Sequence, residues 1–214
     1  MWRISTNLAK IYSFIFQPLL MPFYSLVLLF IYTNFFNLYV GQTLRFLLPV
    51  LVFTFFIPSL FTVVLLKMRY VRDLALSDRV DRIMPYMIFI VSNLSLTYFF
   101  YQSHVLLWFI GLVIAPAVIA LAGLIINFFW KISAHMLGIG GLLGGVLSVC
   151  FHVKATSPVF LFAILFILAG LLGVCRLYLR ASTAAQVYVG FLVGLVLAYG
   201  SVYGGLRLMF SFLR

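Results

Sequence analysis

The chain has 214 residues, of which 66% are hydrophobic and only 8% are charged. A soluble domain carries about 25% charged residues, so this composition cannot cover a folded surface in water. It excludes a soluble globular fold and predicts one transmembrane domain over residues 1–214.

Seven apolar runs are long enough to cross the hydrocarbon core of a bilayer, which takes about 20 residues as a helix. Their residues do not alternate between apolar and polar, as the strands of a membrane barrel do. We therefore expect an all-α helical bundle of about six to seven transmembrane helices. In chain order the runs are 11–36, 46–66, 84–101, 105–129, 136–153, 158–175 and 187–211.

Prolines and cysteines fall at a few points in these runs. Pro18 and Pro22 lie inside the first run, and we expect them to bend its helix. Cys150 and Cys175 each end an apolar run without the spacing of metal ligands, so we expect buried thiols rather than a disulfide or a metal site. The sequence has no phosphate-binding glycine loop or dinucleotide motif, and we expect no cofactor.

The connector between the second and third runs holds every acidic residue of the chain, and these are Asp73, Asp78 and Asp81. One interpretation is a solvated connector whose charges pair with one another. The other is that Arg79 and Arg82, three residues apart and just before Pro85, point at one anion. Both interpretations are consistent with the sequence.

Basic residues are unevenly divided between the two faces of the membrane. With seven spans, the N-terminus and the connectors 67–83, 130–135 and 176–186 share one face, and they hold 10 of the 14 basic residues. The positive-inside rule favours the cytoplasm for this face, but arginines that bind a substrate are not neutral topology markers, so the opposite orientation stays open. The opposite face holds Arg45, Lys154, Arg207 and Arg214. The net charge of +11 suits anionic lipid headgroups, whereas the scattered basic residues do not form a nucleic-acid-binding patch.

A second polar cluster opens the fifth run, where Ser133 and His135 precede a glycine-rich stretch. A helix N-terminus favours phosphate, and a histidine there could donate a proton to a leaving oxygen. The alternative is that His135 is only a polar residue of the membrane interface. Close helix packing explains the glycines, which form small-xxx-small pairs at 140/144 and 141/145.

A third polar cluster separates the sixth and seventh runs. Arg176 ends the sixth run, and Ser182 and Gln186 lie four residues apart on one face of the next helix. Arg176 could bind an anion or extend to the lipid headgroups. Because the three clusters share one face, they predict an oxyanion pocket at the membrane interface.

Two stretches resemble motifs of the type 2 phosphatidic acid phosphatase superfamily. "KISAHMLGIGG" is similar to the second motif, Pro-Ser-Gly-His, with Ser133 and His135 in the matching places. "CRLYLRASTAAQVYVGFLVG" resembles the third motif, Ser-Arg-x5-His-x3-Asp. Arg176 matches its arginine, whereas Ser182 replaces the histidine and Gln186 replaces the aspartate. The resemblance covers roughly residues 79–194, which would form a phosphatase-like core.

The resemblance implies an all-helical, metal-free membrane enzyme that removes phosphate from lipid phosphates or diphosphates. Arg176 and Ser133 would hold the phosphate, with help from Arg79 and Arg82, which loosely match the first motif together with Pro85. His135 would protonate the leaving group. Ser182 would stand in the place of the nucleophile, with Gln186 as its orienting partner.

The replaced nucleophile pair favours binding over catalysis, because glutamine cannot act as the base that a serine nucleophile needs. We expect a protein of the bacterial inner membrane that binds a phosphorylated lipid or isoprenoid headgroup with little hydrolysis. One alternative is an active lipid phosphatase that uses water or Ser182. Another is a transporter or a scaffold for a membrane complex, and self-association is also open.

Overall fold

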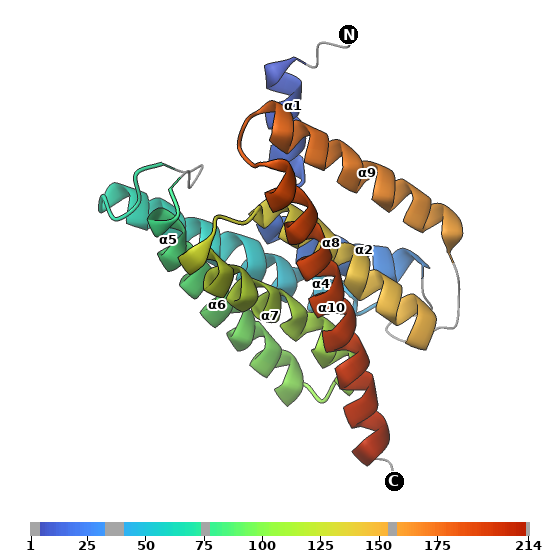
Figure 1. Cartoon of the computed structure of the whole chain (residues 1–214). Helices are drawn as coiled ribbons and strands as arrows, with labels where there is room; N and C mark the ends of the chain where they lie inside the picture. The colour runs from blue at the N-terminus through green and yellow to red at the C-terminus, as the bar shows by residue number, and fades with distance from the viewer. Residues whose placement is uncertain (1–4, 33–40, 74–77, 154–157, 213–214) are drawn as a thin grey trace.

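The computed structural model describes residues 5–32, 41–73, 78–153 and 158–212, and every regular element within these ranges is helical (Figure 1). The prediction of an all-α membrane bundle is confirmed. The seven membrane-spanning segments of the described residues are Thr6–Tyr32, Thr43–Lys67, Val80–Gln102, Leu107–Phe129, Ala134–Val153, Val159–Tyr178 and Ala184–Ser211. The predictions for residues 33–36, Lys154 and Arg214 lie outside the described residues.

The first span is broken in two, as its prolines predict. Helix α1 (Thr6–Ile15) ends before a 3₁₀ turn, η1 (Pro18–Leu20), which leads into α2 (Met21–Tyr32). Pro18 has no backbone N–H to donate and occupies the first position of η1, where that donor is not needed. The break at Phe16–Gln17 leaves backbone groups out of the helix inside the membrane.

The second span contains a π-helical segment. It runs as α4 (Thr43–Leu51), the π segment η2 (Val52–Phe56) and α5 (Ile57–Lys67). Pro58 follows the segment and lacks the N–H that would continue the α pattern. Ser92 of the third span donates its hydroxyl to the carbonyl of Phe53 at 2.5 Å, so a neighbouring helix satisfies one of these carbonyls.

The remaining spans begin or end closer to the polar clusters than the sequence predicts. They are η3 (Val80–Arg82) continuing into α6 (Ile83–Gln102), α7 (Leu107–Phe129), α8 (Ala134–Ser148) with the π segment η4 (Val149–Val153), α9 (Val159–Tyr178) and α10 (Ala184–Phe212). The third span thus starts at Val80 rather than 84, and the sixth ends at Tyr178 rather than 175. Apolar periodicity alone misses these turns because their polar residues are helical.

Helices α8 and α10 pack in parallel with their backbones in contact. A Cβ added to Gly140 would overlap the carbonyl oxygen of Phe191, and one added to Gly144 would overlap that of Leu195. The contacts advance in the same direction along both helices, so the N-termini of α8 and α10 lie at the same end of the bundle. The predicted close packing of Gly140 and Gly144 is confirmed.

The second glycine pair faces a different helix. Added Cβ atoms on Gly141 and Gly145 would meet the side chains of Ile119 and Leu112, both on α7, at 2.6 and 2.9 Å. Helix α7 also packs against α10, in the antiparallel direction. Helix α8 is therefore held on two sides, and this packing fixes the position of its N-terminus.

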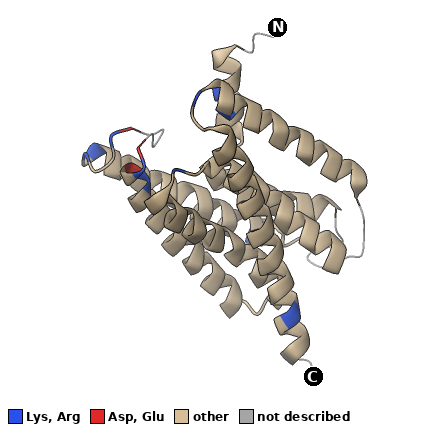
Figure 2. Cartoon of the chain, in the orientation of Figure 1, with Lys and Arg blue, Asp and Glu red and all other residues tan. Residues whose placement is uncertain are grey.

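Figure 2 shows that charged residues gather at one end of the bundle, at the connectors between spans. The acidic residues are confined to the connector between α5 and α6, and a separate basic site near the C-terminal end of α10 is Arg207. The connectors predicted to share a face do so. Phe129 and Ile132, beside the α7–α8 connector, each accept a hydrogen bond from an arginine next to α6.

Candidate anion-binding cavity

A cavity of about 1030 Å³ opens at the charged end of the bundle. Its walls come from the first span, α5, α6, α7, α8 and the connector between α9 and α10. Five of the predicted site residues line it, and they are Arg82, Ser133, His135, Arg176 and Ser182. The structure therefore brings together residues from all three polar clusters, which are separated by up to 100 positions in the sequence.

Arg79 and Gln186 are not among the residues that line this cavity. Arg79 is exposed and donates Nη1–H to the carbonyl of Phe129 at 3.0 Å, while its own carbonyl accepts from the Asn127 side chain. These bonds join the start of the third span to the end of α7. Arg79 and Arg82 donate to different carbonyls on either side of the α7–α8 connector.

Gln186 takes part in a capping box at the start of α10. The hydroxyl of Thr183 accepts a hydrogen bond from the backbone N–H of Gln186 at 3.4 Å. The side-chain oxygen of Gln186 accepts one from the backbone N–H of Thr183 at 3.0 Å. The pattern Thr-x-x-Gln supplies both partners, so the helix start explains why these residue types occur here. The neighbouring Ser182 is buried and lines the cavity.

Arg82 is only 7% exposed and holds the connector that follows α7. Its Nη1 donates to the carbonyl of Ile132 at 2.8 Å. This bond fixes the residues directly before α8, because Ile132 precedes Ser133 in the chain. Arg82 thus positions the N-terminus of α8 and places its own charge in the cavity wall.

Arg176 approaches the same space from the last turn of α9. Its Nε atom is buried and has no hydrogen-bond partner among the described residues. Helix α9 ends two residues later at Tyr178, and the Ala181 N–H donates to the Arg176 carbonyl at 3.1 Å. Arg180 adopts a left-handed φ of 51° in this turn and also lines the cavity. A buried guanidinium nitrogen without a partner indicates that the site is shaped for an additional acceptor.

The pKa of Lys131 shows that the cations of the cavity lie close to one another. Its pKa is lowered from the usual lysine value because the ammonium is partly buried, and because Arg82 and Arg176 lie nearby. Asp78 and Asp73 act in the opposite direction and are the smallest of these effects. None of the described residues that line the cavity is acidic. The described lining of the cavity therefore carries three cations at one end, Arg82, Lys131 and Arg176, and no carboxylate.

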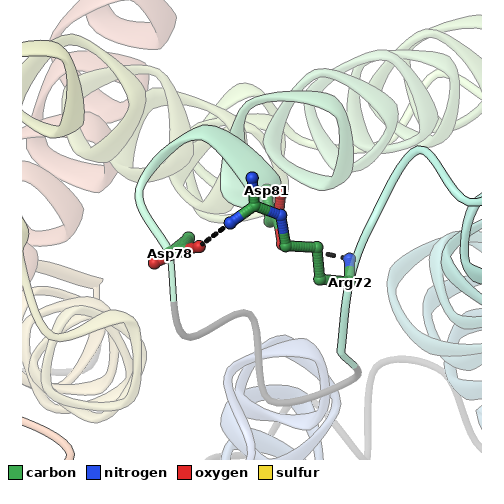
Figure 3. A network of polar contacts seen from close by, with 3 residues as sticks. All are labelled: Arg72, Asp78 and Asp81. Atoms are coloured by element: carbon green, nitrogen blue, oxygen red, sulfur yellow. Dashed lines mark hydrogen bonds and ion pairs between the residues drawn. The ribbon is translucent and has the colours of Figure 1, made fainter.

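Two of the acidic residues are bound elsewhere. Figure 3 shows Arg72 between Asp78 and Asp81 in the connector before α6. The Arg72 guanidinium pairs with Asp78 at 2.7 Å, and its backbone N–H donates to Asp81 at 3.0 Å. For Arg72 and Asp78 the interpretation of a self-paired connector is confirmed, whereas Asp81 accepts a hydrogen bond from the backbone. The pairing keeps these two carboxylates engaged on the connector.

The N-terminus of α8 presents Ser133 and His135. Ser133 precedes the first helical residue, is 2% exposed and makes no capping bond with its side chain. Its hydroxyl has no partner among the described residues. Nε2 of His135 lies 3.1 Å from the carbonyl oxygen of Ser13. A carbonyl can only accept, so Nε2 carries the proton, and a neutral ring keeps its lone pair on Nδ1.

Several cavity residues were not predicted from the sequence. Lys10, Ser13, Ser25, Tyr86 and Asn93 line it together with the predicted set. The side chains of the last four each contain a buried polar atom without a partner among the described residues. One sequence feature could have identified them: each is a polar residue inside or next to an apolar run. In a membrane protein such a polar residue usually faces the interior of the bundle.

The inner part of the cavity is apolar and ends on aromatic rings. Phe109 forms part of this floor. Its ring packs edge-to-face on Phe100 and Phe46 at centroid distances of 5.2 and 5.5 Å. Phe46 and Phe100 stack on each other at 5.7 Å. This cluster separates the cavity from the opposite face of the bundle.

The cavity also has a side opening. Phe14 of α1 is 70% exposed and Val63 of α5 is 40% exposed, and both line the cavity. Both lie about one helical turn from a basic residue at the charged end, Lys10 and Lys67 respectively. Residues that face both the cavity and the outside mark a lateral mouth between α1 and α5, near the depth of lipid headgroups.

The described residues contain no group of three or more His, Cys, Asp or Glu side chains that could hold a metal ion. Cys150 and Cys175 are both buried thiols, as predicted. No protein-family model, no curated protein and no solved structure matches the chain. The shape and charge of the cavity are therefore the basis for assigning a function.

Proposed function

We propose that the protein binds the phosphate group of a phosphorylated lipid or isoprenoid in this cavity, without ordinary hydrolysis. The observation that carries the proposal is the cationic end, where Arg82, Lys131 and Arg176 line one cavity whose described lining contains no acidic residue. A phosphate accepts several charge-assisted hydrogen bonds at once. The Nε of Arg176 and the hydroxyl of Ser133 are donors without a protein partner.

A lipid fits the cavity better than a free anion because the walls change from charged to apolar with depth. A phosphate at the cationic end would leave its hydrocarbon chain beside residues such as Leu112, Val113 and Ile119. The lateral mouth between Phe14 and Val63 gives access from the bilayer at headgroup depth. The proposed location is the bacterial inner membrane, with the cationic end in the cytoplasm, following the excess of basic residues there.

The proposal excludes ordinary hydrolysis because, among the described residues, Ser182 at the nucleophile position has no general base to activate it and no free proton donor for the leaving group. Gln186 is engaged in the capping box with Thr183 and cannot act as a base. His135 donates Nε2–H to the carbonyl of Ser13 in α1. This proton is therefore engaged in a hydrogen bond and is not directed at a leaving group. Ser182 lines the cavity as a hydroxyl that could donate to phosphate.

Binding of radiolabelled dioleoyl phosphatidic acid to the protein in a non-ionic detergent tests the proposal. Arg176→Gln removes the positive charge and keeps a polar side chain, and we expect the Kd to rise about tenfold or more. Arg207→Gln is the matched control, because Arg207 lies toward the opposite end of α10 and donates to Tyr203 at 2.7 Å. An equal loss in both variants would contradict a specific site.

Competition separates the kinds of ligand. Unlabelled phosphatidic acid and farnesyl phosphate should displace the label. Phosphatidylcholine should not, because the positive charge of its choline neutralises the negative charge of its phosphate. Displacement by inorganic phosphate as effective as by either lipid would remove the role of the apolar wall. Failure of all these compounds to bind would reject the proposal.

An active lipid phosphatase is the alternative that the same preparation tests. Phosphate release from phosphatidic acid and undecaprenyl diphosphate is measured with the wild type and with Ser182→Ala. Release that is lost in Ser182→Ala would overturn binding without hydrolysis. If Ser182→His with Gln186→Asp gains release where the wild type has none, the cavity holds phosphate in a reactive position and lacks only its nucleophile.

A further inference from the structure

Some polar groups of the cavity lie much deeper in the membrane than its cationic end, where a lipid headgroup would bind. Asn93 lies on α6, 11 residues after Arg82, and this places it about 16 Å further into the membrane. A hydrocarbon core is about 30 Å thick, so Asn93 lies near its middle. Its side chain is fully buried, and Nδ2 has no partner among the described residues.

Asn93 already makes one bond that explains its position. Its Oδ1 accepts a hydrogen bond at 3.1 Å from the backbone N–H of Ala117, which directly follows Pro116 in α7. A proline inside a helix disturbs the local bonding, and a polar side chain from a neighbouring helix can compensate. This structural role uses the oxygen only. It does not explain the Nδ2 group, which remains as a donor in the cavity wall.

Ser25 lies at the same depth on a different helix. Its hydroxyl is 3.8 Å from where a Cβ on Gly145 would lie, and Gly145 is ten residues, or about 15 Å, beyond His135. Ser25 is 5% exposed, lines the cavity and has no partner for its hydroxyl among the described residues. Two helices thus each bring one unpaired polar group to the middle of the membrane.

Unpaired polar groups at this depth are costly unless the cavity supplies partners for them. The lipid chain of a bound ligand cannot do so, because hydrocarbon has no hydrogen-bonding atoms. A phosphate oxygen or water can. The polar groups at the midplane therefore indicate that hydrophilic material reaches this depth, well past Arg82, Lys131 and Arg176.

We infer that the cavity is the near half of a translocation pathway. In it a phosphate group moves from the cationic end to Asn93 and Ser25, and then across the membrane. The inference rests on the proposed phosphate binding and adds movement to it. The floor formed by Phe109, Phe100 and Phe46 lies near the far ends of α6 and α7 and closes the far end of the pathway in this conformation. The breaks beside the cavity, at Phe16–Gln17 and in the π segment Val52–Phe56, are places where the spans can bend to open it.

Proteoliposomes test the movement of a lipid headgroup. The protein is reconstituted in phosphatidylcholine vesicles with phosphatidic acid that carries a nitrobenzoxadiazole label on one acyl chain. Dithionite quenches only the outer leaflet, about half of the label, in vesicles without protein. We expect the wild type to raise the quenched fraction toward completion, and labelled phosphatidylcholine to stay near half. Equal movement of both lipids would indicate a membrane defect and overturn the inference.

Variants distinguish the pathway from the binding site. Ser25→Ala should slow quenching about fivefold while the Kd for phosphatidic acid stays within twofold, because Ser25 lies far from the cationic end. Ser148→Ala is the matched control, since its hydroxyl is equally buried and unpartnered but does not line the cavity. Asn93→Ala is a second variant with the same expectation. Unchanged rates in both cavity variants would overturn the inference.

Two further outcomes separate the inference from the proposed function. Wild-type protein that binds phosphatidic acid, leaves the quenched fraction at half and takes up no inorganic phosphate would overturn translocation and leave binding intact. Uptake of radiolabelled inorganic phosphate into the vesicles, slowed in Ser25→Ala and without lipid movement, would support the pathway with free phosphate as its passenger. Absence of binding would reject the proposed function itself.

Discussion

Lys131 is a cavity residue whose charge depends on its neighbours. Burial and the nearby arginines Arg82 and Arg176 lower its pKa below the usual lysine value. The ammonium of the unliganded protein therefore loses its proton at a lower pH than that of a free lysine. An anion bound at the cationic end favours the charged form, so binding and protonation of Lys131 support each other.

We expect the affinity for phosphatidic acid to fall as the pH rises from 8 toward 10. The phosphate monoester has its second pKa at about 6, so its own charge is constant over this range. Lys131→Arg keeps the positive charge at every pH in the range and should remove most of the dependence. Binding isotherms of both proteins at several pH values give the comparison. Parallel curves for the two proteins would show that Lys131 does not contact the bound anion.

At the scale of single helices, the stretch that leads into α10 has two roles: some of its residues cap the helix and others line the cavity. Thr183 and Gln186 cap the helix, while Ser182 and Arg176, a few residues earlier, line the cavity. The capping box therefore fixes where α10 begins and keeps the α9–α10 connector short. The polar residues between the two apolar spans divide into those that shape the turn and those that face the cavity.

Gln186→Ala should lower stability by about 1 kcal/mol, because it removes one of the two bonds of the capping box. For a protein of this size that corresponds to a fall of about 2–4 °C in Tm. Gln186→Glu should restore most of the loss, since a carboxylate accepts the same bond. Thermal unfolding in detergent, followed by light scattering, measures the Tm values. The Kd for phosphatidic acid should change less than twofold, whereas a large rise would show that Gln186 acts on the ligand.

At the scale of the whole molecule, the contact between α8 and α10 holds the two helix N-termini that face the cavity. We expect Gly144→Ala to lower the Tm by several degrees, because its Cβ would overlap the Leu195 carbonyl and force the helices apart. Gly200→Ala is the control on α10, since nothing lies within 4 Å of an added Cβ there. It should be neutral or slightly stabilising. Equal effects of the two substitutions would contradict a tight α8–α10 interface.

The number and type of the spans could be predicted from the sequence because bilayer thickness fixes the length of each apolar run. The ends of the spans could not, since Arg82, Arg176 and Gln186 are polar residues inside helical turns. The bend at Pro18 and the glycine contacts of α8 followed from local chemistry. The Thr-x-x-Gln pattern is typical of a capping box, and it lies inside the stretch that resembles a catalytic motif.

The shape of the cavity could not be predicted from the sequence because it depends on how helices that are far apart in the chain pack against one another. Ser25 and Tyr86 gave no sign that they face the same space as Arg82. Asn93, a polar residue in the middle of an apolar run, carried a signal. Its depth becomes informative only once α6, α7 and α2 are placed around one cavity.

The aromatic floor has a consequence for the response to membrane voltage. Where water fills the cavity to Asn93, the electric field concentrates across the remaining thickness, between Asn93 and the opposite face. A phosphate held at Arg176 then feels little of the potential, whereas one that passes the floor crosses most of it. Each elementary charge that does so exchanges about 2.3 kcal/mol per 100 mV. With the cationic end in the cytoplasm, a negative interior favours movement of the anion outward, and reversing the potential reverses this preference.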